Sequence, residues 1–245
     1  MKKIILSFFM ILSLVSLTGC EKDDFDASLE PPLSKEILTM AVPDFLTEEQ
    51  QLLYRRAYSL YQHMFGGETS AIEYGEFSSQ LGTTSQEHET IQIGSFSYTK
   101  SLGRYKDFFD FEKLIKSVFS ARFWDERNII DKEVGTEIYI EKDKSLYFIE
   151  FSRGSGYFYN KNFPDKFELL EKKDTLISFN VIGHYSQVWP YENETSLMRN
   201  ERRKTSYDYV IEFPITLVLT DEGWRFDKFY TALADEKPFE EVYPY

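Results

Sequence analysis

The second half of the chain carries the alternation that most constrains its fold. From Thr136 to Phe151, "TEIYIEKDKSLYFIEF", apolar and polar residues alternate on both sides of Lys142-Asp143-Lys144. Alternation with period two places one face of a strand in a core, and the three central residues are typical of a hairpin turn. Further strands are expected from "FELLEKKDTLISFNVIGHYS" (one strand or two), from Tyr207–Leu219 and, after a turn at Asp221–Gly223, from residues 224–229.

A helical pattern comes before these strands. The stretch "TEEQQLLYRRAYSLYQHMFGG" opens with Thr47 and Gln50 in the spacing of a capping box, and its apolar residues recur every three or four positions. Tyr54, Tyr58 and Tyr61 form a second apolar stripe beside the first. Two interpretations stay open: a helix covered on two sides by the core, or a helix whose tyrosines line the wall of a ligand pocket.

Shorter elements lie between this helix and the strand run. Residues 91–98 predict a strand with a bulge near Gly94, and a second helix is expected from about Asp110. Ser120 has the position of a new N-cap, for a short helix that continues to Ile130. Because helices come first and strands follow, the order predicts an α+β fold in which N-terminal helices pack on a mostly antiparallel sheet.

The first twenty residues predict export and lipidation. Lys2 and Lys3 precede the apolar run Ile4–Leu17, which is shorter than the ~20 residues of a membrane-spanning helix. Leu17-Thr18-Gly19-Cys20 then has the pattern of a bacterial lipobox, and Cys20 is the one cysteine of the chain. We therefore expect residues 1–19 to be a signal peptide, and Cys20 to carry acyl chains that anchor an extracytoplasmic protein to the cell membrane.

Residues 20–46 predict a tether between the lipid and the domain. The stretch is charged, contains Pro31-Pro32 and lacks a periodic apolar pattern. A single α+β domain is then expected over residues 47–245. The alternative is an N-terminal arm that packs on the domain through its apolar residues Ile37, Leu38, Met40, Val42 and Phe45.

The charge of the mature chain excludes some partners. Without Lys2 and Lys3 the chain has 26 basic and 41 acidic residues, a net charge of −15. A field of this sign argues against binding to nucleic acid and against electrostatic docking on anionic lipid, and it favours a basic partner.

No catalytic or cofactor motif stands out. The three histidines, His63, His88 and His184, do not share the spacing of metal ligands, and no cysteine follows Cys20. There is no nucleophile elbow, P-loop or dinucleotide fingerprint. We expect neither a cofactor nor a metal, and nothing in the sequence supports an enzyme.

The segment Gln187–Ser206 has the composition of a binding surface. It concentrates aromatic and basic residues in an acidic protein, and such residues are enriched at binding hot spots. The alternative is a solvated hairpin loop whose tryptophan folds back on the sheet. The candidate partner-binding residues are Trp189, Tyr191, Arg199, Arg202 and Arg203.

The order of elements between Thr47 and Phe229 resembles a known family. A tyrosine-rich helix ending in Gly-Gly is followed by a strand, then by "FFDFEKLIKSVFS", "IYIEKDKSLYF" and "DEGWRFDKF". This order resembles the IseA-type inhibitors of DL-endopeptidases, exported proteins of Gram-positive bacteria. The resemblance implies a non-catalytic domain that occupies the catalytic cleft of NlpC/P60-type cell-wall hydrolases.

A second resemblance leads to a different function. The ending "GWRF" after a strand also occurs in NTF2-like and cystatin-like domains. The alternative function is therefore an NTF2-like lipoprotein that binds a small ligand, with Tyr54, Tyr58 and Tyr61 on the wall of its pocket. A catalytic pocket is the third possibility, and fold alone does not decide among them.

Overall fold

The protein has the expected α+β fold. Five helices and three mostly antiparallel sheets are present in the computed structural model, which describes residues 30, 33–65, 89–102, 105–149, 157–187 and 190–234. The predicted signal peptide and the predicted lipidation site, Cys20, lie outside these residues. The helices are α1 (Lys35–Thr39), α2 (Glu48–Phe65), α5 (Phe108–Val118), α6 (Ala121–Arg127) and α7 (Ser196–Thr205).

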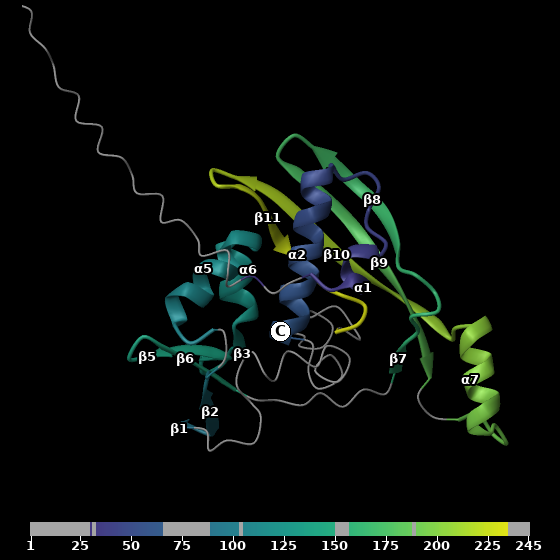
Figure 1. Ribbon diagram of the computed structural model, residues 1–245, viewed down its shortest axis with the longest axis horizontal. Helices are drawn as coiled ribbons and strands as arrows, with labels where there is room; N and C mark the ends of the chain where they lie inside the picture. The colour runs from purple at the N-terminus through teal and green to yellow at the C-terminus, as the bar shows by residue number, and fades with distance from the viewer. Residues whose placement is uncertain are drawn as a thin grey trace, which may run out of the picture.

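One face of the larger sheet forms one side of the core. It has the order β11-β10-β9-β7, and β8 also pairs with β9, so that β7 and β8 follow one another along the same side of β9 (Figure 1). Its strands are β7 (Tyr157–Tyr159), β8 (Lys166–Lys173), β9 (Leu176–Gln187), β10 (Tyr209–Thr220) and β11 (Gly223–Lys228).

Alternation along β9 and β10 selects the face that is buried. Phe179 and Val181 on β9 lie opposite Ile215 and Phe213 on β10, and all four side chains are buried. The residues between them face the other side of the sheet and are partly exposed. One apolar face of a twisted antiparallel sheet thus remains for helices to cover.

Helix α2 covers that face. Thr47 and Gln50 exchange hydrogen bonds, N–H to Oε1 at 3.0 Å and N–H to Oγ1 at 3.3 Å, which confirms the expected capping box. Figure 1 shows α2 running across the sheet, with α5 and α6 at the side of β11. Phe119, between α5 and α6, stacks on Phe123 at 4.2 Å between ring centroids, and both rings belong to the core.

Two smaller elements differ from their expectation. Ser120 caps α6 as predicted, but the helix ends at Arg127, and Ile129 and Ile130 belong to β3 (Ile129–Asp131), which pairs with β4 (Thr136–Glu137). The predicted bulge at Gly94 is instead a hairpin turn in which this glycine has a φ of 59°. The turn separates β1 (Thr90–Ile93) from β2 (Phe96–Lys100).

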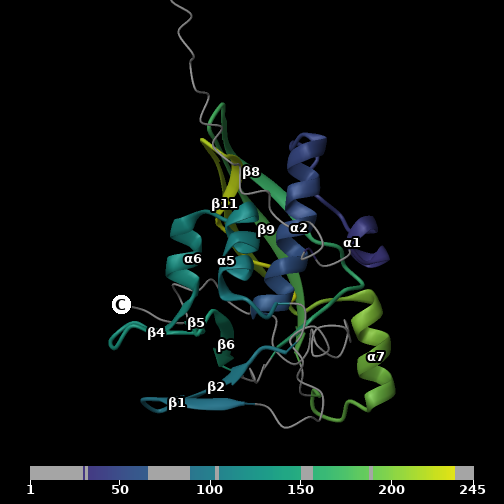
Figure 2. The same ribbon diagram turned by 60° about the vertical axis from the view of Figure 1, so that its left-hand side comes forward.

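The second sheet lies on the side of α5 and α6, as Figure 2 shows. Its order is β1-β2-β6-β5, with β5 (Tyr139–Lys142) and β6 (Ser145–Ile149) joined by the expected hairpin. Asp143 and Lys144 in its turn have φ values of 52° and 64°. A two-residue hairpin turn with two such values fits the right-handed twist of its strands.

The prediction that residues 20–46 form a tether is wrong for residues 33–46. Residues 33–46 pack on the domain: Ile37, in α1, is 5% exposed, and the Phe45 ring lies 5.3 Å from that of Phe179 on β9. The arm was the alternative interpretation of this segment. That interpretation agrees with the structure, because the apolar side chains of the arm pack against the core and are removed from water.

The segment Gln187–Ser206 is not only a loop. Residues 196–205 form helix α7, which lies beyond the end of β7 and β9, away from α5 and α6 (Figures 1 and 2). Asparagine, arginine and lysine interrupt any apolar stripe here, so the helical period was not visible in the sequence.

Candidate functional site

Helix α7 is a short helix without an apolar anchor. Thr195 caps its start by accepting the N–H of Met198 at 3.2 Å, and Arg202, Arg203 and Lys204 stand in its last turn, where cations are favoured by the helix dipole. None of its side chains is buried. An isolated helix of ten residues is marginal in water, so other contacts must hold α7 in place.

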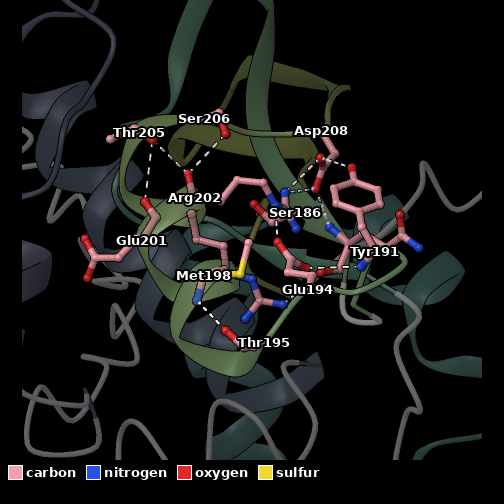
Figure 3. Close-up of polar contacts among 12 residues, drawn as sticks. Ser186, Tyr191, Glu194, Thr195, Met198, Glu201, Arg202, Thr205, Ser206 and Asp208 are labelled. Carbon is pink, nitrogen blue, oxygen red and sulfur yellow. Dashed lines mark hydrogen bonds and ion pairs between the residues drawn. The ribbon is translucent and has the colours of Figure 1, made fainter.

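A cluster of charged side chains supplies those contacts. Arg202 donates from Nε to Glu194 at 2.9 Å and from Nη1 to both carboxylate oxygens of Asp208 at 2.9 and 3.0 Å. Asp208 also accepts the backbone N–H of Gln187 at 2.7 Å. We refer to Tyr191, Glu194, Arg202 and Asp208 as the arginine staple (Figure 3). It joins the start of α7, its last turn and the chain that enters β10.

Tyr191 is the solvent-exposed member of the staple. Its hydroxyl donates to Asp208, and the guanidinium of Arg202 lies 4.4 Å from the centre of its ring. Its backbone N–H donates to Glu194 at 3.1 Å. The residue is nevertheless 46% exposed, so one part of its ring is fixed while the rest faces solvent. A fixed, half-exposed tyrosine offers contact area at a small further cost in conformational entropy.

The two carboxylates of the staple are ionised at neutral pH. The hydrogen bond from Arg202 lowers the pKa of Glu194 below its ordinary value. Burial raises the pKa of Asp208, but hydrogen bonds from Tyr191, Gln187 and Arg202 outweigh it, and the pKa is lowered overall. Carboxylates whose pKa falls on folding stabilise the fold above their ordinary values of 3.8 and 4.5, and this support is lost as the pH falls further.

A buried asparagine side chain holds the C-terminal end of α7. Asn160, which is fully buried, donates to the carbonyl oxygens of Arg203 at 2.8 Å and Ser206 at 3.2 Å. Arg203 in turn donates from Nη2 to the carbonyl oxygen of Gln187 at 2.8 Å. Carbonyl groups at a helix end lack partners inside the helix, and here the side chain of Asn160, the residue after β7, satisfies two of them.

The candidate arginines therefore have roles inside the protein. The side chain of Arg202 is only 20% exposed and belongs to the staple, and Arg203 contacts the end of β9. Arg199 donates to Ser196 at 3.3 Å within α7. Tyr191 is brought together with Arg202 as expected for one site, whereas Trp189 lies outside the described residues.

The residues that face outward from α7 were not among the candidates. Leu197 is 71% exposed and Met198 is 57% exposed. Glu201 and Lys204 form an exposed ion pair one turn further on, and Figure 3 shows Glu201 directed away from the staple. At 100° per residue, Leu197, Glu201 and Lys204 share the side of the helix opposite Arg199 and Arg202.

Sequence reasoning also missed the partners of the arginines. Glu194 lies eight positions before Arg202 and Asp208 six positions after it, and opposite charges at such distances are common without any contact. Asn160 gives no sequence signal, because its role depends on the packing of β7 against β9.

The three tyrosines of the ligand-pocket hypothesis lie in the core. Tyr54 and Tyr61 have no exposed area and Tyr58 is 8% exposed. The Tyr54 ring lies 5.9 Å from Phe167 in an edge-to-face arrangement, and Tyr61 lies 5.5 Å from Phe229. The core interpretation of these side chains agrees with their positions.

Metal ligands and membrane-spanning helices are two further features that could indicate a function. Within the described ranges no three His, Cys, Asp or Glu side chains are grouped as a metal ion requires, and no helix there is long and apolar enough to cross a membrane. A scan against protein-family models gives no match, and a search among curated proteins finds no similar sequence.

Proposed function

We propose that this chain is a lipid-anchored extracytoplasmic protein whose domain binds another protein of the cell envelope without catalysis. The observation that carries the proposal is the state of α7. The helix is held by the arginine staple, which joins its last turn to the residues before and after it, and by Asn160 at its C-terminal end, yet it buries none of its own side chains. A helix fixed in this way contributes nothing to the core, and a preorganised surface is what a binding partner requires.

The specific role that we propose is inhibition of an NlpC/P60-type cell-wall DL-endopeptidase. The support is the resemblance in element order together with the lipobox, which would keep the domain near the cell wall. The small-ligand alternative depended on Tyr54, Tyr58 and Tyr61. All three are buried in the core, where Tyr54 and Tyr61 pack against phenylalanine rings, and this alternative has therefore lost its wall residues.

An inhibition assay tests this role. The mature chain with Cys20→Ser, which carries no lipid, is titrated into a purified NlpC/P60-type DL-endopeptidase acting on a peptidoglycan peptide. We expect cleavage to fall to the background at a slight molar excess of the chain. A cell-wall muramidase serves as the control, and its activity should not change. Full DL-endopeptidase activity at a large excess of the chain would exclude the inhibitor role.

A further inference from the structure

The exposed side of α7 combines two properties that favour binding. Its apolar side chains Leu197 and Met198 are among the most exposed of the described residues. At 100° per residue Leu197 lies opposite Arg202, and Met198 lies between them and nearer to Arg202, while the helix itself is fixed by the hydrogen bonds of Arg202 and Asn160. Exposed apolar groups on a mobile loop gain little on binding, because their ordering costs conformational entropy. On α7 much of that cost has already been met by the staple.

The charge of the protein restricts what can cover this face. Residues 190–208 contain four acidic and four basic side chains and are neutral as a group, so the −15 charge of the mature chain lies elsewhere. A second copy of the chain would bring the same charge, and an anionic lipid surface would be repelled in the same way. A protein of positive net charge would be attracted by the acidic domain and would meet a contact without net charge at α7.

We propose that the exposed side of α7 inserts Leu197 and Met198 into an apolar groove on a protein of positive net charge. The inference rests on the proposed function as a protein-binding domain, and it adds the contact residues and the chemistry of the partner. In this arrangement the apolar pair provides the affinity. Arg202 and Arg203 hold the helix in place, and the acidic remainder of the domain increases the rate of encounter.

Photo-crosslinking tests this surface without requiring that the partner is known beforehand. The full chain is produced in its own cells with p-benzoylphenylalanine in place of Leu197, of Met198 or of Val134, a control in the β3–β4 turn that is 73% exposed. We expect positions 197 and 198 to join to the same positively charged protein, at peptides that line an apolar groove, and position 134 not to join to it. An adduct with lipid, with a second copy or with an acidic protein, the same adduct from position 134, or no adduct would overturn the proposal.

An affinity measurement separates this inference from the inhibitor role. The probe is the purified NlpC/P60-type DL-endopeptidase domain, and the variants are Leu197→Ala/Met198→Ala and the control Leu169→Ala/Leu170→Ala on β8, also exposed. We expect the first to weaken binding about tenfold or more and the second to leave it unchanged. Binding by the wild type that both variants retain would overturn the surface and keep the inhibitor role. A crosslinked basic protein that is not a hydrolase would overturn the inhibitor role and keep the surface.

Discussion

At the scale of single residues, Arg202 has a different role from the one that the composition of the segment Gln187–Ser206 suggests. Arginines near aromatic residues are typical of hot spots, but here both partners of the guanidinium belong to the same chain. An arginine with two carboxylates is a directional connector, because its planar donors match each carboxylate in one orientation. Arg202 would therefore affect binding indirectly, by keeping α7 ordered.

Arg202→Ala should loosen α7 without unfolding the domain. The change leaves Glu194 and Asp208 close together without their cation, and the two negative charges then repel. We expect backbone amide exchange in α7 to become about tenfold faster or more, while exchange in β9 and β10 stays the same. Lys204→Ala is the matched control, since its exposed ion pair with Glu201 adds little. Unchanged exchange in both variants would show that the staple is not needed.

Asp165 is the second residue with a testable electrostatic role. Burial raises its pKa to about 6 from the ordinary value of 3.8, although Tyr159 donates a hydrogen bond to it at 2.9 Å. Because the folded state binds this proton more tightly than the unfolded state, ionisation of Asp165 destabilises the fold. The cost develops between pH 3.8 and about 6 and is complete above that range.

Asp165→Asn should therefore stabilise the protein at neutral pH and have little effect in acid. The amide can still accept the hydrogen bond from Tyr159, and it has no charge to bury. We expect a gain of about 2 kcal/mol in the free energy of unfolding at pH 8, and nearly none at pH 4. Urea unfolding at the two pH values measures both. The same change at both would contradict a burial cost of the charge.

At the scale of elements, the arm formed by residues 33–46 is a part of the fold. Ile37 enters the core with 5% exposure, whereas the next residue, Leu38, is 53% exposed. Arg55 on α2 also donates from Nε to the carbonyl oxygen of Ile37 at 3.2 Å. The arm thus fixes the place at which the chain leaves the domain toward its predicted lipid anchor.

The neighbouring residues Ile37 and Leu38 allow a matched test of the arm. Ile37→Ala should cost about 2–3 kcal/mol of stability, as expected for a truncated buried side chain. Leu38→Ala should change the stability by less than about 0.5 kcal/mol. Urea unfolding of both variants measures the difference. Two equally small effects would indicate that the segment is a spacer, as its composition first suggested.

Local signals in the sequence predicted most of the elements. The Thr47–Gln50 box, the Ser120 cap and the Lys142–Lys144 turn depend on neighbours within a few residues, and the structure has all three. The arm was only the alternative interpretation and α7 was not predicted, because both are fixed by contacts distant in sequence, such as Asn160 with Arg203. The candidate site had the same limit: its residue types marked the segment, but only the packing decides which side chains face outward.

At the scale of the whole molecule, the predicted anchor and the domain have separate roles: the anchor would bind the membrane and the domain would bind a partner. Acyl chains on Cys20 would supply the affinity for the membrane, and the acidic domain would have no attraction to anionic lipid of its own. Cys20→Ser should therefore move the protein from the membrane fraction to the soluble fraction, or stop its maturation. Cell fractionation with detection of the precursor and mature forms measures this outcome. Normal processing with retention in the membrane would contradict lipidation.

The central claim is that the preordered α7 is the surface that meets a protein partner. Backbone amide exchange of the mature chain, with and without the NlpC/P60-type DL-endopeptidase domain, tests it most directly. We predict slow exchange in α7 of the free protein, and a further slowing in the complex that is largest from Leu197 to Glu201. Rapid exchange of α7 in the free protein, or protection in the complex only at segments remote from α7, would contradict the claim.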